Sequence, residues 1–201
     1  MSLLERLFHR RPKVWDLLHR IHMVRAISQT NAVELAALAK YAARAKIALE
    51  IGSFQGVSAA TIARNLQSGG YLYCVDPWPS KIGHSDPVFQ IFIRHLNRTK
   101  TTDKIRIIRD FSANVADRLP TQLDFAFIDG DHSWEGIEVD WAIVAPRLKE
   151  AGVICLHDTA IPSEEPWRDF ESCHFYDLKI RPNNNFELVD TVYSMRILRK
   201  R

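Results

Sequence analysis

Five short apolar runs of this chain each end at a carboxylate, namely Glu50, Asp76, Asp110, Asp129 and Asp158. The runs show little polar alternation, which is typical of strands in a parallel sheet with helices over both faces. Ligands of such open sheets bind outside the carboxyl ends of the strands. The five carboxylates would gather at this edge, so the pattern predicts a functional site there.

The segment after the first run has the composition of a ligand-binding turn. Gly52 follows the run directly, and Gly56 comes four residues later, where a helix is expected to begin. Glycine lets the backbone turn tightly and approach a ligand. The segment lacks the third glycine of a dinucleotide fingerprint and the Lys-Ser/Thr pair of a phosphate loop. We therefore expect a nucleoside with a charged amino-acid arm; binding of NAD would instead favour a dehydrogenase.

A second group of polar residues follows the fourth and fifth runs. Asp129, Asp131 and His132 come after the fourth run, and His157 and Asp158 close the fifth. Neighbouring strand ends let these side chains converge on a divalent cation; carboxylates suit Mg²⁺, whereas the His157 imidazole suits Mn²⁺, Fe²⁺ or Zn²⁺ better. The alternative is structural, with Asp131 capping the following helix and both histidines bonding backbone carbonyls.

Composition indicates one globular domain. The chain has 201 residues, 46% of them hydrophobic and 25% charged, and its formal charge of +3 is too small to argue for nucleic acid. The 3 cysteines show neither disulfide nor zinc spacing, and no run is long enough to span a bilayer. We expect a cytoplasmic protein without membrane insertion. An alternative for residues 1–11, which alternate apolar and basic positions, is an amphipathic helix on a membrane surface.

Two N-terminal helices are followed by alternating strand and helix signals. Helices are expected at residues 2–10, 14–26, 31–43, 56–66, 87–97, 112–118, 134–150 and 167–173. Strands are expected at residues 46–50, 71–76, 105–110, 125–129 and 153–158. Two further strands, at residues 186–189 and 191–198, are expected to be separated by Asp190. This order predicts an α/β fold.

The stretch Ala48-Leu49-Glu50-Ile51-Gly52-Ser53-Phe54-Gln55-Gly56-Val57-Ser58-Ala59 resembles the class I S-adenosylmethionine-dependent methyltransferases, and especially their small-molecule O-methyltransferase branch. The resemblance runs from about residue 35 to residue 156. It implies a Rossmann-like methyltransferase fold: a seven-stranded, mostly parallel sheet with an antiparallel last strand and helices on both faces. Residues 1–45 would form extra helices packed on a single domain of residues 46–201.

The resemblance also implies roles for matching residues. The cofactor-binding set would be Glu50, Gly52, Ser53, Gly56, Asp76, Phe111, Ser112 and Asp129, with Asp76 on the ribose hydroxyls and Phe111 and Ser112 at the adenine. The metal ligands would be Asp129, His157 and Asp158, and Asp131 or His132 would be the base. Trp78 would either stack on a ring of the cofactor or acceptor, or anchor its loop.

The resulting prediction is methyl transfer from S-adenosylmethionine to a hydroxyl of a small molecule, assisted by Mg²⁺ or Mn²⁺. Two other classes stay open. One is a metal-dependent hydrolase or hydroxylase that uses the acidic and histidine cluster directly, and the other is a non-catalytic protein that binds the cofactor. The N-terminal helices would form either a homodimer contact or a cap over the site.

Overall fold

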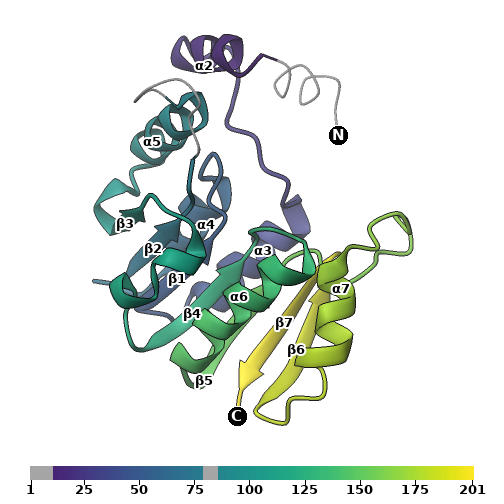
Figure 1. The fold of residues 1–201 in the computed structure, drawn as a ribbon. Helices are drawn as coiled ribbons and strands as arrows, with labels where there is room; N and C mark the ends of the chain where they lie inside the picture. Colours follow the sequence, from purple (N-terminus) through teal and green to yellow (C-terminus); the bar gives the residue numbers. More distant parts are fainter. Residues whose placement is uncertain (1–10, 79–85) are drawn as a thin grey trace.

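A computed structural model describes residues 11–78 and 86–201, so the helix predicted at residues 2–10 lies outside the described residues. Its seven strands form one sheet in the order β3-β2-β1-β4-β5-β7-β6 (Figure 1). The strands are β1 (Ile47–Ile51), β2 (Tyr71–Val75), β3 (Ile105–Ile108), β4 (Leu123–Ile128), β5 (Leu148–Leu156), β6 (Phe186–Val192) and β7 (Met195–Lys200). β1 to β5 are mutually parallel, and β7 runs antiparallel to both β5 and β6. The predicted mostly parallel sheet with an antiparallel last strand is confirmed.

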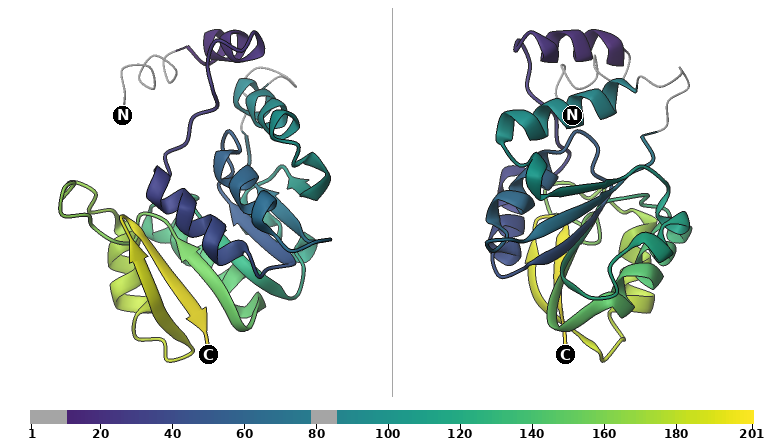
Figure 2. Two further views of the ribbon diagram at one scale, coloured as in Figure 1. Left: turned by 180° about the vertical axis from the view of Figure 1, so that it is seen from behind. Right: turned by 90° about the vertical axis from the view of Figure 1, so that its left-hand side faces the viewer.

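Helices cover both faces of this sheet (Figure 2). They are α2 (Pro12–Arg20), α3 (Ala32–Ala42), α4 (Val57–Asn65), α5 (Pro87–Thr99), α6 (Trp134–Val144) and α7 (Glu171–Phe175). On one face, Leu38 of α3 and Ile62 of α4 pack in a cluster with Phe125 of β4. On the other face, Ile137 of α6 packs in a cluster with Ala126, the next residue of β4. Alternate residues of β4 thus enter opposite cores, which explains why the strand is apolar throughout.

The strand order reverses at β1, which lies between β2 and β4. After β3 the chain passes to the other side of β1 and continues with β4 and β5. At such a switch point the loops that leave neighbouring strands diverge and open a crevice outside their carboxyl ends. The fold therefore places the β1 and β4 exits, which carry most of the predicted site residues, side by side.

Helix α6 is shorter than predicted, and β5 begins earlier. The helix ends at Val144 rather than at residue 150, and the chain then makes a 3₁₀ turn over Ala145–Arg147. Pro146 lacks a backbone N–H and disfavours helical continuation, so β5 starts at Leu148. The helix predicted at residues 112–118 is also corrected, because this segment forms two separate 3₁₀ turns, Ser112–Asn114 and Ala116–Arg118.

Two other helix predictions need shifted bounds. The helix predicted at residues 14–26 spans Pro12–Arg20, because proline is well suited to a first turn and His22 takes a positive φ of 65° just beyond the end. The helix predicted at residues 167–173 begins only at Glu171 and continues as a π-helical turn over Tyr176–Ile180. Before it, Arg168 is held by ion pairs in the loop rather than in a helix.

The break between the last two strands is at Tyr193 and Ser194, not at Asp190. β6 runs through Asp190 with a register shift between Leu188 and Asp190, and the Asp190 carboxylate accepts a hydrogen bond from the Tyr41 hydroxyl at 3.0 Å. Tyr193 takes a φ of 55° and makes the turn. The irregularity at Asp190 is therefore a register shift within β6 and not the end of a strand.

Helix α2 docks on α5 through one face. Trp15 is buried beside Ile91, and Asp16 forms an ion pair with Arg94. His19 is 1% exposed and lies against Arg98, with 3.0 Å between its Nε2 and the Arg98 Nη1. Burial and the charges of Arg98 and Arg94 lower the pKa of His19 to about 4.

Among the described residues, no helix combines the length and apolar character needed to cross a membrane.

We predict that α2 loosens as the pH falls. Undocked His19 takes up a proton near pH 6.5, whereas docked His19 resists protonation down to about pH 4, so docking loses free energy between these values. Amide hydrogen exchange in α2, corrected for intrinsic rates, should show protection falling roughly tenfold or more between about pH 7 and pH 5. His19→Gln should abolish this pH dependence. Equal protection of the wild-type helix at both pH values would contradict the prediction.

Candidate functional site

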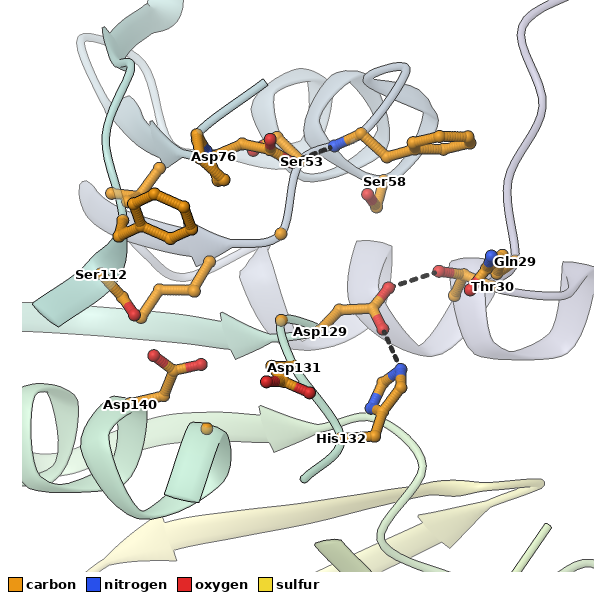
Figure 3. Close-up of a pocket in the computed structure, with 18 of the residues that line it drawn as sticks. Gln29, Thr30, Ser53, Ser58, Asp76, Ser112, Asp129, Asp131, His132 and Asp140 are labelled. Carbon is orange, nitrogen blue, oxygen red and sulfur yellow. Dashed lines mark hydrogen bonds and ion pairs between the residues drawn. The ribbon is translucent and has the colours of Figure 1, made fainter. Parts of the chain in front are cut away.

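A cavity of about 560 Å³ opens at the switch point, between the exits of β1, β2 and β4. Its volume lies in the range of sites for small molecules and cofactors. It is lined by residues 27–30, 51–58, 75–77, 110–113, 129–133, 135, 136, 139 and 140 (Figure 3). Most of these segments follow strands and were predicted from the sequence. Residues 27–30 come instead from the N-terminal part of the chain. The boundary at residue 45 between this part and the predicted cofactor-binding domain stays a prediction.

The two predicted glycines shape the wall formed by the β1 exit. Gly52 has a φ of 87°, and a β-carbon there would lie 1.9 Å from the carbonyl oxygen of Asp129. Gly56 has a φ of 83°, and a β-carbon would come within 2.8 Å of the Phe92 ring. L-residues with side chains rarely adopt this left-handed backbone conformation. Gly52 therefore lets the turn lie this close to the end of β4, and Gly56 lets it lie against Phe92 of α5.

Asp76 presents its carboxylate to the cavity at the β2 exit. One carboxylate oxygen accepts a hydrogen bond from the Phe54 N–H at 2.9 Å, and the other accepts one from the Trp78 N–H at 2.8 Å. The Ser53 N–H adds a third backbone hydrogen bond to this carboxylate, and burial raises the pKa of Asp76. Trp78 is 2% exposed and donates its indole N–H to the Phe54 carbonyl at 2.8 Å. Trp78 thus anchors the loop, the second of its two predicted roles.

Glu50 lies behind the cavity rather than in its wall. Its side chain is fully buried and accepts a hydrogen bond from the Ser53 hydroxyl at 2.5 Å. Burial raises the pKa of Glu50 to about 7. Because Ser53 lines the cavity and Glu50 does not, Glu50 acts on the site by orienting Ser53. Direct contact of Glu50 with a cofactor stays a prediction.

A buried chain of charges holds Asp129 in place. Its Oδ1 lies 2.8 Å from Nδ1 of His157, whose Nε2 lies 3.4 Å from Oε2 of Glu34. Its Oδ2 accepts a hydrogen bond from the Thr30 hydroxyl at 3.5 Å. Burial alone would lower the pKa of His157, but the carboxylates of Asp129 and Glu34 outweigh it and hold this pKa well above its ordinary value. His157 is therefore a buried imidazolium between two carboxylates.

His132 faces the carboxylates of Asp129 and Asp158 from the cavity side. Its Nε2 lies 3.5 Å from Oδ2 of Asp158 and 4.0 Å from Oδ1 of Asp129. The ring stacks on Phe170 with 5.4 Å between centroids, and Figure 3 shows it pointing toward Asp129. Asp131 lines the cavity and accepts a hydrogen bond from the Ser133 N–H at 3.0 Å. The prediction that Asp131 caps the following helix is wrong, because the cap of α6 is Ser133, whose hydroxyl accepts a hydrogen bond from the Gly136 N–H at 3.1 Å.

The predicted metal ligands are only partly brought together. Nδ1 of His157 lies 2.8 Å from Oδ1 of Asp129 and 3.5 Å from Oδ2 of Asp158, but Oδ1 of Asp158 lies 2.5 Å from a guanidinium nitrogen of Arg168. The possible donors that converge are instead Asp129, His132 and His157, with their ligand atoms within 4.8 Å of one another. Mg²⁺ prefers oxygen ligands, and both His157 nitrogens already face carboxylates. These residues do not fit Mg²⁺, and assistance by any divalent metal stays a prediction.

The part of the cavity wall formed by the loop after β3 and by α6 contains two predicted residues and one residue that the sequence did not indicate. Phe111 and Ser112 line the cavity as expected, and the Phe111 side chain is 60% exposed. Asp140 of α6 also lines it and is buried. Gln55, in the cavity wall at the β1 exit, was also not predicted as a site residue from the sequence. Its Oε1 accepts a hydrogen bond from the Ile27 N–H at 2.8 Å, while its Nε2 has no partner among the described residues.

Comparison with known proteins agrees with this geometry. A family model described as a methyltransferase domain matches residues 49–159, which contain the exits of all five parallel strands. An O-methyltransferase from Bacillus cereus, solved in complex with SAH, is 21% identical with a TM-score of 0.64; the match covers 94% of this chain and 89% of that one. The O-methyltransferase TomG from Streptomyces achromogenes, solved with SAM, is 16% identical with a TM-score of 0.65, covering 94% and 88%.

A methyltransferase from Podospora anserina, solved with SAH bound, is 12% identical with a TM-score of 0.66; the match covers 95% of this chain and 86% of that one. At these identities the solved structures establish the fold, whereas the family model covers more than half of the chain. The chain belongs to the methyltransferase domain family, and it shares the fold of the solved O-methyltransferases.

Proposed function

We propose that this protein transfers a methyl group from S-adenosylmethionine to a hydroxyl of a small molecule. The observation that carries the proposal is the meeting of two features in one cavity: the glycine turn of Gly52 and Gly56, and a histidine base, His132, beside two carboxylates. The first feature suits the cofactor, and the second suits removal of a hydroxyl proton.

The residues present fit the cofactor. Asp76 presents its carboxylate to the cavity, which suits a ribose diol. Gln55 is buried in the cavity wall, and its Nε2 lacks an acceptor among the described residues, which suits the carboxylate of the methionine arm. The left-handed turn at Gly52 leaves room for a ligand beside the backbone. When bound, the cofactor supplies an electrophilic methyl group on a sulfonium.

His132 is the proposed base. Its Nε2 faces the carboxylates of Asp158 and Asp129, which favours a proton on that nitrogen and leaves Nδ1 to accept one from the acceptor hydroxyl. This tautomer is assigned from the surrounding carboxylates. The same carboxylates stabilise the imidazolium that forms, and stacking on Phe170 fixes the ring. Asp129 positions His132, and Asp131 holds the Ser133 N–H just before α6.

The other predicted functions have less support. A metal-dependent hydrolase or hydroxylase needs open ligand positions, whereas Asp158 is neutralised by Arg168 and His157 is enclosed by Asp129 and Glu34. A protein that only binds the cofactor has no need for an oriented base such as His132. The homodimer, the absence of a nucleic-acid partner and the cytoplasmic location stay predictions.

Asp76→Ala should weaken cofactor binding. Loss of two acceptors that face the ribose should raise the Kd for S-adenosylhomocysteine by roughly tenfold or more in calorimetric titration. Because Asp76 also holds the Phe54 and Trp78 backbones, Asp76→Asn should be measured beside it, with thermal unfolding to check the fold. Asp103→Ala, at an exposed position outside the cavity, is the control. An unchanged Kd in folded Asp76→Ala would refute this role.

His132→Ala should slow catalysis without weakening the cofactor complex. We expect kcat to fall roughly 10²- to 10⁴-fold, as for loss of a general base, while the Kd for S-adenosylhomocysteine stays within about twofold. Added imidazole should restore part of the rate. His174→Ala, which removes an exposed histidine paired with Asp169, should leave both quantities unchanged. A parallel loss of cofactor affinity in His132→Ala would argue for a structural role instead.

Turnover should persist in the presence of EDTA. The cations of Arg168 and His157 already neutralise the carboxylates that would hold a metal, and proton removal by His132 requires none. The measurement is the methylation rate after chelation and after addition of Mg²⁺, Mn²⁺ or Zn²⁺. Loss of activity in EDTA that is restored by one of these ions would establish the metal and would overturn the metal-free proton step.

A further inference from the structure

One face of α2 is left uncovered. The helix docks on α5 through Trp15 and His19, which are both buried. The opposite face carries three apolar side chains, and Val14, Leu17 and Ile21 are 49%, 55% and 54% exposed. A helix turns by about 100° per residue, so these three side chains lie in one stripe about 60° wide. Single exposed apolar residues are ordinary, whereas a contiguous stripe marks an interaction surface.

The exposed charged side chains around this stripe are cationic. Those between residues 11 and 25 are Arg11, Lys13, Arg20 and Arg25. The single acid of that range, Asp16, forms an ion pair with Arg94 of α5, and its other oxygen lies 3.9 Å from a guanidinium nitrogen of Arg20. Because Lys13 and Arg20 are two helical turns apart, both lie on one flank of the stripe. The surface is therefore an apolar stripe bordered by positive charge.

The position of α2 favours a flat partner over a shaped one. α2 forms one end of the molecule, beyond α5, and a long segment joins it to α3 (Figures 1 and 2). Its outward face is convex and only about 14 Å long, since the helix has 9 residues. A stable protein–protein interface buries about 800 Å² on each partner over complementary shapes. A second copy bound through the stripe would also place the same cationic flank against itself.

A lipid bilayer meets these requirements. It needs no matching shape, its interface admits apolar side chains, and anionic headgroups supply the charge that complements the cations of the helix. We propose that α2 docks this protein on an anionic membrane surface. Val14, Leu17 and Ile21 enter the boundary between headgroups and acyl chains, while Lys13 and Arg20 contact headgroup phosphates. The helix lies in the plane of the surface with α5 behind it, so docking is independent of methyl transfer.

The test is binding of the full chain to lipid vesicles. Vesicles of phosphatidylcholine are compared with vesicles that also contain about one-third phosphatidylglycerol, and the bound fraction is measured by co-sedimentation. The wild-type protein should bind the anionic vesicles roughly 30-fold more tightly than the neutral ones. Sodium chloride at about 0.5 M should remove most of this preference, because the salt screens the headgroup charge.

Two double variants separate the apolar stripe from the charges. Leu17→Ser combined with Ile21→Ser keeps every charge and should weaken binding to anionic vesicles roughly tenfold or more. Lys13→Gln combined with Arg20→Gln keeps the stripe and should also weaken that binding roughly tenfold, while the weak binding to neutral vesicles stays the same.

The matched controls are Leu178→Ser and Lys179→Gln, at exposed positions in the π-helical turn after α7. Leu178 is 67% exposed, so its exchange removes at least as much apolar surface as the exchange of Leu17 does. Both controls should bind vesicles as the wild-type protein does. Thermal unfolding and hydrogen-exchange protection of α2 at neutral pH check that every variant keeps its fold and its docked helix.

Two results would overturn the inference. The first is a wild-type protein that does not bind anionic vesicles; if this protein is a dimer that Leu17→Ser with Ile21→Ser converts to a monomer, the stripe belongs to a second copy. The second is vesicle binding that both α2 double variants retain, which would place the lipid contact elsewhere in the chain. Neither result bears on the proposed methyl transfer, because the stripe lies outside the cavity.

Discussion

The buried ion chain from Asp129 through His157 to Glu34 is the interaction on which the arrangement of the site depends. It joins the exits of β4 and β5 to the first turn of α3. Glu34 is fully buried, and its other oxygen accepts hydrogen bonds from the backbone and hydroxyl of Ser194, next to β7. Removing one member of such a chain leaves an uncompensated buried charge, which typically costs about 3–5 kcal/mol. The chain therefore specifies one relative position for four separate elements.

The same chain explains why the N-terminal part belongs to the site. Asn31 and Glu34 form a capping box at the start of α3, and Thr30, just before it, bonds to Asp129. Residues 27–30 line the cavity in consequence, and Gln55 fastens this segment by accepting from the Ile27 N–H. A segment with little chemistry in its sequence thus completes a wall of the pocket, because its neighbours hold it there.

Ion pairs that neutralise the carboxylates at the ends of β4 and β5 also determine the chemistry of these residues. The carboxylates of Asp129 and Asp158 both lie against His157 and would repel each other, but His157 and Arg168 supply two positive charges beside them. Their remaining capacity as acceptors is directed at His132 on the cavity side. Carboxylates that in isolation indicate a metal site can therefore serve a histidine base once cations of the chain are packed against them.

Apolar runs and strand-end acids were sufficient to predict a parallel sheet with a site at its carboxyl edge, because burial acts locally and leaves a periodic pattern in the sequence. The seven-stranded topology with an antiparallel last strand was predicted from the family resemblance instead. The partners of those acids could not be read in this way. Glu34 lies 123 residues before His157, and only the folded chain brings them together and encloses them. Asp140 lies outside the predicted motifs, and Gln55 lies within the glycine turn without a predicted role. What distinguishes both residues is an unpartnered polar atom in a buried wall. Hydrogen bonds and ion pairs depend on distances of a few ångströms between remote residues, which only the tertiary structure decides.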